Sequence, residues 1–157
     1  MDLDVTVPYV YAVPPAGIPG LQLGRDGLVI ILRDIRFTNR SRTHHVSLDL
    51  TLLVALSADL GSGSYVLVRE EKTYWVDPPS DYLFSPISIS PQETKSGTMC
   101  FLLPPETVRG SGGEERIAPN RCRLAVVDRV SGKVKVSNIS QEARASQQAF
   151  GTAQSEL

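Results

Sequence analysis

The segment VSLDLTLLVAL, residues 46–56, has a large apolar residue at every second position along its whole length. Successive side chains of a β-strand point to opposite faces, so a period of two predicts a strand with one buried face. The face predicted to be buried carries Val46, Leu48, Leu50, Leu52, Val54 and Leu56. The segment therefore favours a β-sheet protein.

Other short apolar runs, rich in β-branched residues and bounded by Gly, Pro, Asn or Ser, predict further strands. Turn signals separate these runs, and almost no stretch of the chain has helical period. The sequence therefore predicts an all-β fold, an antiparallel β-sandwich of about seven or eight strands. The remaining strands are expected near residues 28–37, 65–70, 73–76, 83–89, 98–104, 121–128 and 133–136.

The run LVIILRDIRF, residues 28–37, does not keep one phase. Val29 and Ile31 share a face with Ile35 and Phe37 only if Arg33 points inward or is displaced. Because a β-bulge displaces one residue of a strand, we expect a bulge near Arg33.

Three regions follow from the changes in composition. Residues 1–27 are rich in proline and glycine, and their VTVPYVYAV segment predicts an edge strand, added to the chain's own sheet or to a neighbouring subunit. Residues 28–140 form the predicted sandwich. Residues 141–157 are a polar tail, expected to be disordered or a short helix.

The formal net charge of −1 and the pI of about 6.1 provide no general attraction to nucleic acid or to an anionic membrane. No apolar run has the length of a membrane-spanning helix, and the N-terminus lacks the regions of a signal peptide. We therefore expect no membrane span and no nucleic-acid partner. The expected location is cytoplasmic, or extracellular if a leader has been removed.

The two cysteines, Cys100 and Cys122, are not expected to form a bridge. If Met99 and Phe101 face the core, Cys100 points away from it, whereas Cys122 shares the phase of Leu124. This mismatch argues against a disulfide between adjacent strands.

Two segments resemble bacterial immunoglobulin-like domains of unknown function. They are RFTNRSRTHHVSLDLTLLV, residues 36–54, and ISPQETKSGTMCFLLP, residues 89–104. The resemblance covers roughly residues 28–136 and implies an immunoglobulin-like sandwich. The Cys-Trp-Cys order of antibody domains is missing, because Trp75 precedes both cysteines.

The sequence contains few residues that are suitably placed for catalysis or for metal binding. The only histidines, His44 and His45, are adjacent, and neighbouring strand residues point to opposite faces. They are therefore poorly placed to share a metal or an active site. Ser41 and Thr43 have the character of turn formers rather than nucleophiles. We expect no enzymatic activity, no metal and no cofactor.

Two groups of side chains are candidates for binding a partner or a ligand. Arginines gather with a histidine around one turn, where they could bind a phosphate or an acidic partner. Aromatic residues lie beside Pro78 and Pro79, where exposed rings are typical of recognition surfaces, although the single Trp75 could equally fill the core. The candidates are Arg36, Arg40, Arg42, His44, Tyr74, Trp75 and Tyr82.

The sequence thus favours a non-enzymatic module that binds another protein, or associates with itself, through edge strands or the loop around Trp75. The alternative is a β-sandwich that binds a carbohydrate or another small ligand through the aromatic and arginine residues.

Overall fold

The fold is an all-β sandwich, as the alternation predicts. The computed structural model describes residues 1–15, 27–57, 63–69 and 79–139. Within these ranges there are nine strands and one short helix, α2 (Pro105–Val108). The strands are β1 (Leu3–Thr6), β2 (Tyr9–Val13), β3 (Leu28–Asn39), β4 (Val46–Leu56), β5 (Tyr65–Arg69), β6 (Ile87–Ile89), β7 (Thr94–Leu103), β8 (Ile117–Asp128) and β9 (Val134–Asn138). The expected strand at 73–76 lies outside the described residues.

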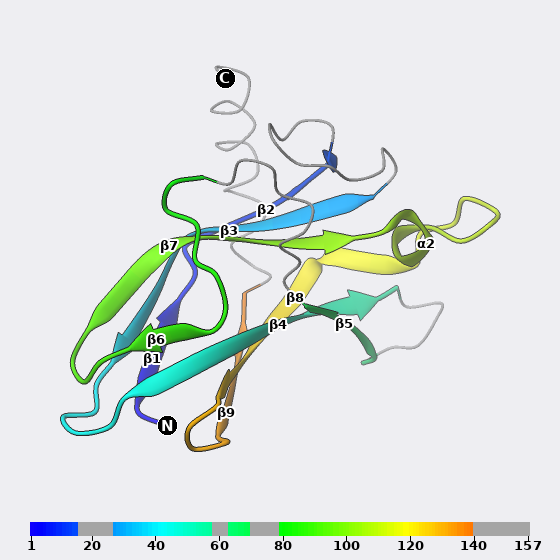
Figure 1. The fold of residues 1–157 in the computed structure, drawn as a ribbon. Helices are drawn as coiled ribbons and strands as arrows, with labels where there is room; N and C mark the ends of the chain where they lie inside the picture. Colours follow the sequence, from blue (N-terminus) through cyan, green and yellow to red (C-terminus); the bar gives the residue numbers. More distant parts are fainter. Residues whose placement is uncertain (16–26, 58–62, 70–78, 140–157) are drawn as a thin grey trace.

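The strands form two antiparallel sheets, one above the other (Figure 1). In the first, here called the β3 sheet, β1 and β2 pair with the two halves of one side of β3, and β7 pairs with the other side. In the second, the β4 sheet, β5 and β6 pair with one side of β4, β8 pairs with the other, and β9 pairs with β8. In the β4 sheet the two longest strands, β4 and β8, are neighbours at the centre, whereas in the β3 sheet β3 is central and β7 lies at one edge.

The core lies between the sheets and follows the predicted period of two. All inward-facing residues of β4 from Val46 to Val54 are buried, as are Met99, Phe101 and Leu103 of β7. Burying an aliphatic or aromatic side chain of this size contributes about 1.5–3 kcal/mol relative to exposure, which makes this face the main source of stability. Leu56, which continues the pattern at the end of β4, is only half-buried.

A bulge in β3 confirms the prediction of a displaced residue near Arg33, but it reverses part of the expected facing. The register of β3 against β7 shifts between Leu32 and Ile35, and Asp34 has a positive φ of 57°. After this extra residue, Ile35 continues on the face of Ile30 and Leu32, all within the main core. The expectation that Val29 and Ile31 share that face is wrong, because the bulge changes the phase of the strand by one residue.

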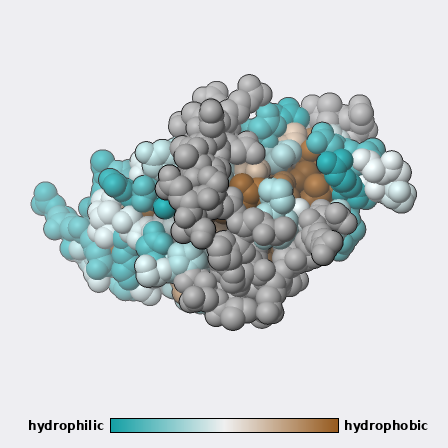
Figure 2. Space-filling view, turned by 90° about the horizontal axis from the view of Figure 1, so that it is seen from above, coloured by the Kyte–Doolittle hydropathy of each residue, from teal (hydrophilic) through white to brown (hydrophobic). Residues whose placement is uncertain are grey.

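Both faces of the β3 sheet are buried where the first half of β3, before the bulge, pairs with the end of β7. Val29, Ile31, Cys100 and Leu102 form a second cluster on the outer side, together with Tyr11, Val13 and Tyr82. Seen from the side of β2 and β3, hydrophobic residues gather in one area right of centre (Figure 2). This part of the outer side of the β3 sheet is therefore buried, whereas Arg36 and Ser96, beyond the bulge, are exposed.

A short segment, residues 79–86 and here called the strap, runs along the free edge of β7. The backbone N–H of Thr98 donates to the carbonyl of Asp81 at 3.0 Å, and the N–H of Leu83 donates to the carbonyl of Thr98 at 2.9 Å. The Thr98 hydroxyl also donates to the Asp81 carboxylate at 2.9 Å. The strap thus satisfies backbone groups that an open sheet edge would leave exposed.

The N-terminal strands belong to the same sandwich, which confirms the prediction of an edge strand in the chain's own sheet. On this side of the molecule the two sheets are joined by Lys135 of β9, whose ammonium donates to the carbonyl of Leu3 in β1. The register pairs Lys135 with Val126, a core residue, so this charged side chain points inward. Inward-pointing charges are one way in which natural proteins protect edge strands from pairing with another chain.

The cysteines are unbridged, as the phase of their strands predicts, and both are buried. Cys122 lies in the main core and Cys100 in the outer cluster of the β3 sheet. None of the described helices is long and apolar enough to cross a membrane.

Candidate functional site

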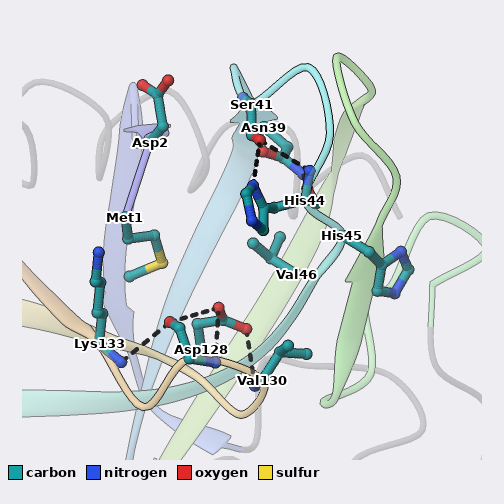
Figure 3. A pocket seen from close by; sticks show the side chains of 11 residues that line it. Met1, Asp2, Asn39, Ser41, His44, His45, Val46, Asp128, Val130 and Lys133 are labelled. Carbon is teal, nitrogen blue, oxygen red and sulfur yellow. Dashed lines mark hydrogen bonds between the residues drawn. The ribbon is translucent and has the colours of Figure 1, made fainter.

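A hollow of about 640 Å³ lies where the β3–β4 turn meets the β8–β9 turn (Figure 3). It gathers several polar residues that the sequence distinguished, including Ser41, His44 and His45. The two histidines point in different directions in Figure 3, with His45 directed away from the hollow. The hollow is therefore the first candidate for a functional site.

Asn39 forms one wall of this hollow and is almost completely buried. Its amide nitrogen donates to the carbonyls of His44 at 2.7 Å, Ile89 at 3.2 Å and Ser90 at 3.3 Å. Its Oδ1 accepts the backbone N–H of Ser41 at 3.1 Å. With both ends of the amide engaged, Asn39 joins the β3–β4 turn to the end of β6 and contributes mainly to the fold.

Asp128 ends β8 on the opposite wall and is equally buried. Its carboxylate accepts the backbone N–H groups of Ser47, Val130 and Ser131 at 3.1–3.2 Å and the Ser131 hydroxyl at 2.7 Å. Burial alone raises the pKa of Asp128, but these hydrogen bonds, first that from Ser47, outweigh it and bring the pKa below its ordinary value. A carboxylate held ionised by four donors is well suited to fixing a hairpin and poorly suited to taking up a proton.

Ser41 and Thr43 are turn formers, as predicted. The Ser41 oxygen accepts the backbone N–H groups of His44 at 2.9 Å and Thr43 at 3.2 Å. The His44 Nδ1 lies 2.9 Å from the Thr43 hydroxyl oxygen and 3.3 Å from that of Ser41. These contacts are all within one turn, and they hold the His44 ring over the hollow.

Metal binding would need several ligands that converge. Across residues 1–15, 27–57, 63–69 and 79–139, no three His, Cys, Asp or Glu side chains are arranged to hold a metal ion.

The predicted arginine cluster is spread over the surface. Arg40 forms an ion pair with Asp4, both side chains being partly exposed, and Arg42 is exposed in the same turn. Arg36 lies on β3 and lines a second hollow, beside Pro8 and Ile139, away from His44. Exposed ion pairs contribute about 0–1 kcal/mol, so the Arg40 pair does little for stability. The structure does not bring Arg36 and His44 into one site.

The predicted aromatic surface is only partly described. Tyr74 and Trp75 lie outside the described residues. Tyr82 is in the strap and is buried in the outer cluster of the β3 sheet, which is contrary to the expectation of an exposed ring. The prolines near Tyr82 suggested an exposed ring. The ring is buried because the Tyr82 hydroxyl forms hydrogen bonds with the backbone of Cys100 at the edge of β7.

Sequence reasoning missed a different surface, the outer side of the β4 sheet, here called the outer β4 face. The cross-strand register places side chains from β5, β4, β8 and β9 on this face. Four large hydrophobic side chains there are exposed: Leu67 at 68%, Val134 at 58%, Val136 at 42% and Tyr65 at 38%. Among the residues whose side chains are described, the face includes Ser47, Asp49, Thr51, Leu53, Ala55, Tyr65, Leu67, Arg123, Ala125, Val127, Val134, Val136 and Asn138.

The two outer sides of the sandwich therefore differ. The outward-facing Val29 and Ile31 of the β3 sheet are buried, whereas Val134 and Val136 of the outer β4 face remain in solvent beside the half-buried Val127. Single exposed apolar side chains are ordinary, but a contiguous group over several strands is typical of an interaction surface. A signal was present in the sequence, since KVKV alternates with both of its valines on one face.

Arg123 of β8 lies within this face, between Leu53 and Asn138 in the register. Its guanidinium stands over the ring of Tyr65, 6.0 Å from the ring centroid, a cation–π arrangement. Arginine and tyrosine are the residue types enriched where binding energy concentrates in protein interfaces.

Comparison with known proteins leaves the family open: no family model matches the chain, and no curated protein is significantly similar to it. The function must therefore be argued from the surface itself.

Proposed function

We propose that this chain is a non-enzymatic protein-binding β-sandwich, immunoglobulin-like in character, and that the outer β4 face is its binding surface. The observation that carries the proposal is the exposure of Leu67, Val134 and Val136 on one continuous sheet face. Of the large hydrophobic side chains that are exposed among the described residues, four lie on the outer β4 face and one, Tyr9, lies on the β3 sheet.

The state of two of the sheet edges, those of β7 and β9, favours the outer β4 face over these edges as the binding surface. The strap occupies the edge of β7, and the inward-pointing Lys135 protects β9. Strand addition by a partner requires free backbone donors and acceptors along an open edge. A strand added at the edge of β7 would have to displace the strap, and one added at β9 would have to disturb the contact of Lys135 with Leu3. The outer β4 face is accessible.

Ligand binding through arginines and aromatic rings has less support. Arg36 and His44 line different hollows, and the ring of Tyr82 is buried. The polar groups on opposite walls of the first hollow, Asn39 and Asp128, already have their hydrogen-bond partners within the chain.

A binding experiment with surface variants tests the proposal. The intact protein and the double variant Leu67→Lys/Val136→Lys serve as baits in lysate from the source cells, with Val130→Lys as the matched control. Val130 is as exposed as Leu67 but lies in the β8–β9 turn, away from the face. We expect a bound protein that the control retains and the double variant loses. Equal recovery by all three baits would reject the outer β4 face as the binding surface.

A further inference from the structure

From the charges on the outer β4 face we infer that its partner is a different protein, one that presents a carboxylate to Arg123 within an otherwise apolar contact. This inference rests on the proposed function and specifies the chemistry of the partner.

The position of Arg123 is the first step. Directly opposite it across the strands are Leu53 on β4 and Asn138 on β9, and Leu67 continues the same row on β5. Neither of the two ion pairs formed among the described residues involves Arg123. Its guanidinium is thus a charge without a carboxylate partner, set among hydrophobic side chains.

Covering this face makes such a charge costly. An apolar partner surface would remove water from the guanidinium of Arg123, and an unpaired buried charge strongly opposes binding. A carboxylate removes this cost, because it accepts two parallel N–H bonds from the planar guanidinium. The ring of Tyr65 beneath the group helps to fix the guanidinium plane, which favours this two-bond geometry over contact with a point charge.

A second copy of this chain does not fit the same requirement. In a two-fold dimer the same face meets itself, so it must be complementary to itself. Among the described side chains of the face, the only carboxylate is Asp49, and it already pairs with Arg129 at 3.2 Å. Two copies would therefore bring two Arg123 side chains together without a free acid between them.

Nucleic acid fits no better. Phosphate backbones are bound by several cations along a groove, each of which neutralises one phosphate. Among the described side chains of the face, one arginine without an ion-pair partner, Arg123, lies near Leu53 and Leu67. The combination of a hydrophobic sheet face and one such guanidinium matches a protein surface with an acidic residue at its centre.

Random peptides displayed on phage provide a probe that assumes no particular partner. The intact protein is immobilised and panned in parallel with Arg123→Glu, Arg123→Lys, the double variant Leu67→Lys/Val136→Lys, and Arg42→Glu as the charge-reversal control. Arg42 is exposed in the β3–β4 turn and not on the face. Circular dichroism and urea unfolding establish that each variant is folded.

We expect peptides enriched in Asp or Glu beside aromatic or β-branched residues. Their binding should fall at least tenfold with Arg123→Glu, less with Arg123→Lys and not at all with Arg42→Glu, and it should weaken as salt is raised. Arg123→Glu should itself select peptides with Lys or Arg. Peptides that need Leu67 and Val136 but lack acidic residues would overturn this inference and leave the proposed function standing. If the double variant Leu67→Lys/Val136→Lys bound every selected peptide as well as the wild type, both this inference and the proposed function would be rejected.

Discussion

The hydroxyl of Tyr82 donates to the carbonyl oxygen of Cys100 at 3.3 Å and accepts the backbone N–H of the same residue at 3.2 Å. One side chain thus takes the place of a neighbouring strand at the edge of β7. It continues the backbone pairing that Asp81 and Leu83 make with Thr98. The strap closes this edge through a tyrosine as well as through its own backbone.

Removal of that hydroxyl should weaken the fold. Tyr82→Phe keeps the ring but leaves the buried N–H and C=O of Cys100 without this partner, at a cost of about 1–3 kcal/mol. The free energy of unfolding in urea measures the effect. Tyr9→Phe, at an exposed tyrosine, is the control and should change stability by less than about 0.5 kcal/mol. Equal effects of the two variants would show that the hydroxyl does not cap the strand.

A side chain at Gly97 should displace the strap. A Cβ atom there would lie 2.1 Å from the carbonyl oxygen of Asp81 and 2.8 Å from Cγ of Leu83. The first is a backbone atom, so Gly97→Ala must move the strap, and we expect a loss of about 1–3 kcal/mol. Faster hydrogen exchange at the Thr98 amide would locate the change. Ser96→Ala, the exposed neighbour in β7, should leave both quantities unaltered.

Asp128 should make the stability depend on pH in acid. Its pKa is lower in the folded protein than in the unfolded chain, whose aspartates titrate near about 3.9. The folded state then binds fewer protons, so the contribution of Asp128 is complete above that unfolded value. It is lost as pH falls through the lower folded value.

The variant Asp128→Asn isolates this contribution. At pH 7 it should be less stable than the wild type by about 1–3 kcal/mol, because an amide cannot replace all the accepted hydrogen bonds. The difference in the free energy of unfolding between the wild type and Asp128→Asn should become smaller in urea titrations repeated below about pH 4. Asp49→Asn, in a half-exposed ion pair, should cost no more than about 1 kcal/mol. A gap that stayed constant down to pH 2 would contradict the assignment.

The thiol of Cys122 should be inert in the folded protein. Burial raises its pKa to about 12, and its Sγ donates to the carbonyl of Pro119 at 3.0 Å. Since the thiolate is the reactive form, iodoacetamide at pH 8 should leave Cys122 unmodified until urea unfolds the chain. Peptide mass spectrometry reads the modification. Rapid labelling without urea would mean that this part of β8 opens readily.

Local pattern predicted the all-β class and most of its strands. The period of two in residues 46–56 identified β4 and its buried face, and the phases of Cys100 and Cys122 predicted two unbridged thiols. The irregular phase around Arg33 located the bulge. These conclusions concern residues that are close together in the sequence. The two-residue period of a strand determines directly which of them share a face.

The candidate site was predicted less well. Proximity in sequence suggested one cluster of Arg36, Arg40, Arg42 and His44, but the bulge and the turn direct Arg36 and His44 to different hollows. Proline content suggested an exposed Tyr82, but its hydroxyl is needed at an edge that only the pairing of β3 with β7 creates. Such outcomes depend on contacts between segments far apart in the chain.

The sequence by itself determined which residues share a strand face, because side chains alternate wherever a strand forms. Only the tertiary structure decided which faces are covered. Ile31 and Val136 are both outward-facing β-branched residues, yet Ile31 is buried in the outer cluster of the β3 sheet and Val136 is left in solvent. The physical reason is that alternation sets the direction of a side chain, whereas burial depends on which distant segment packs against it.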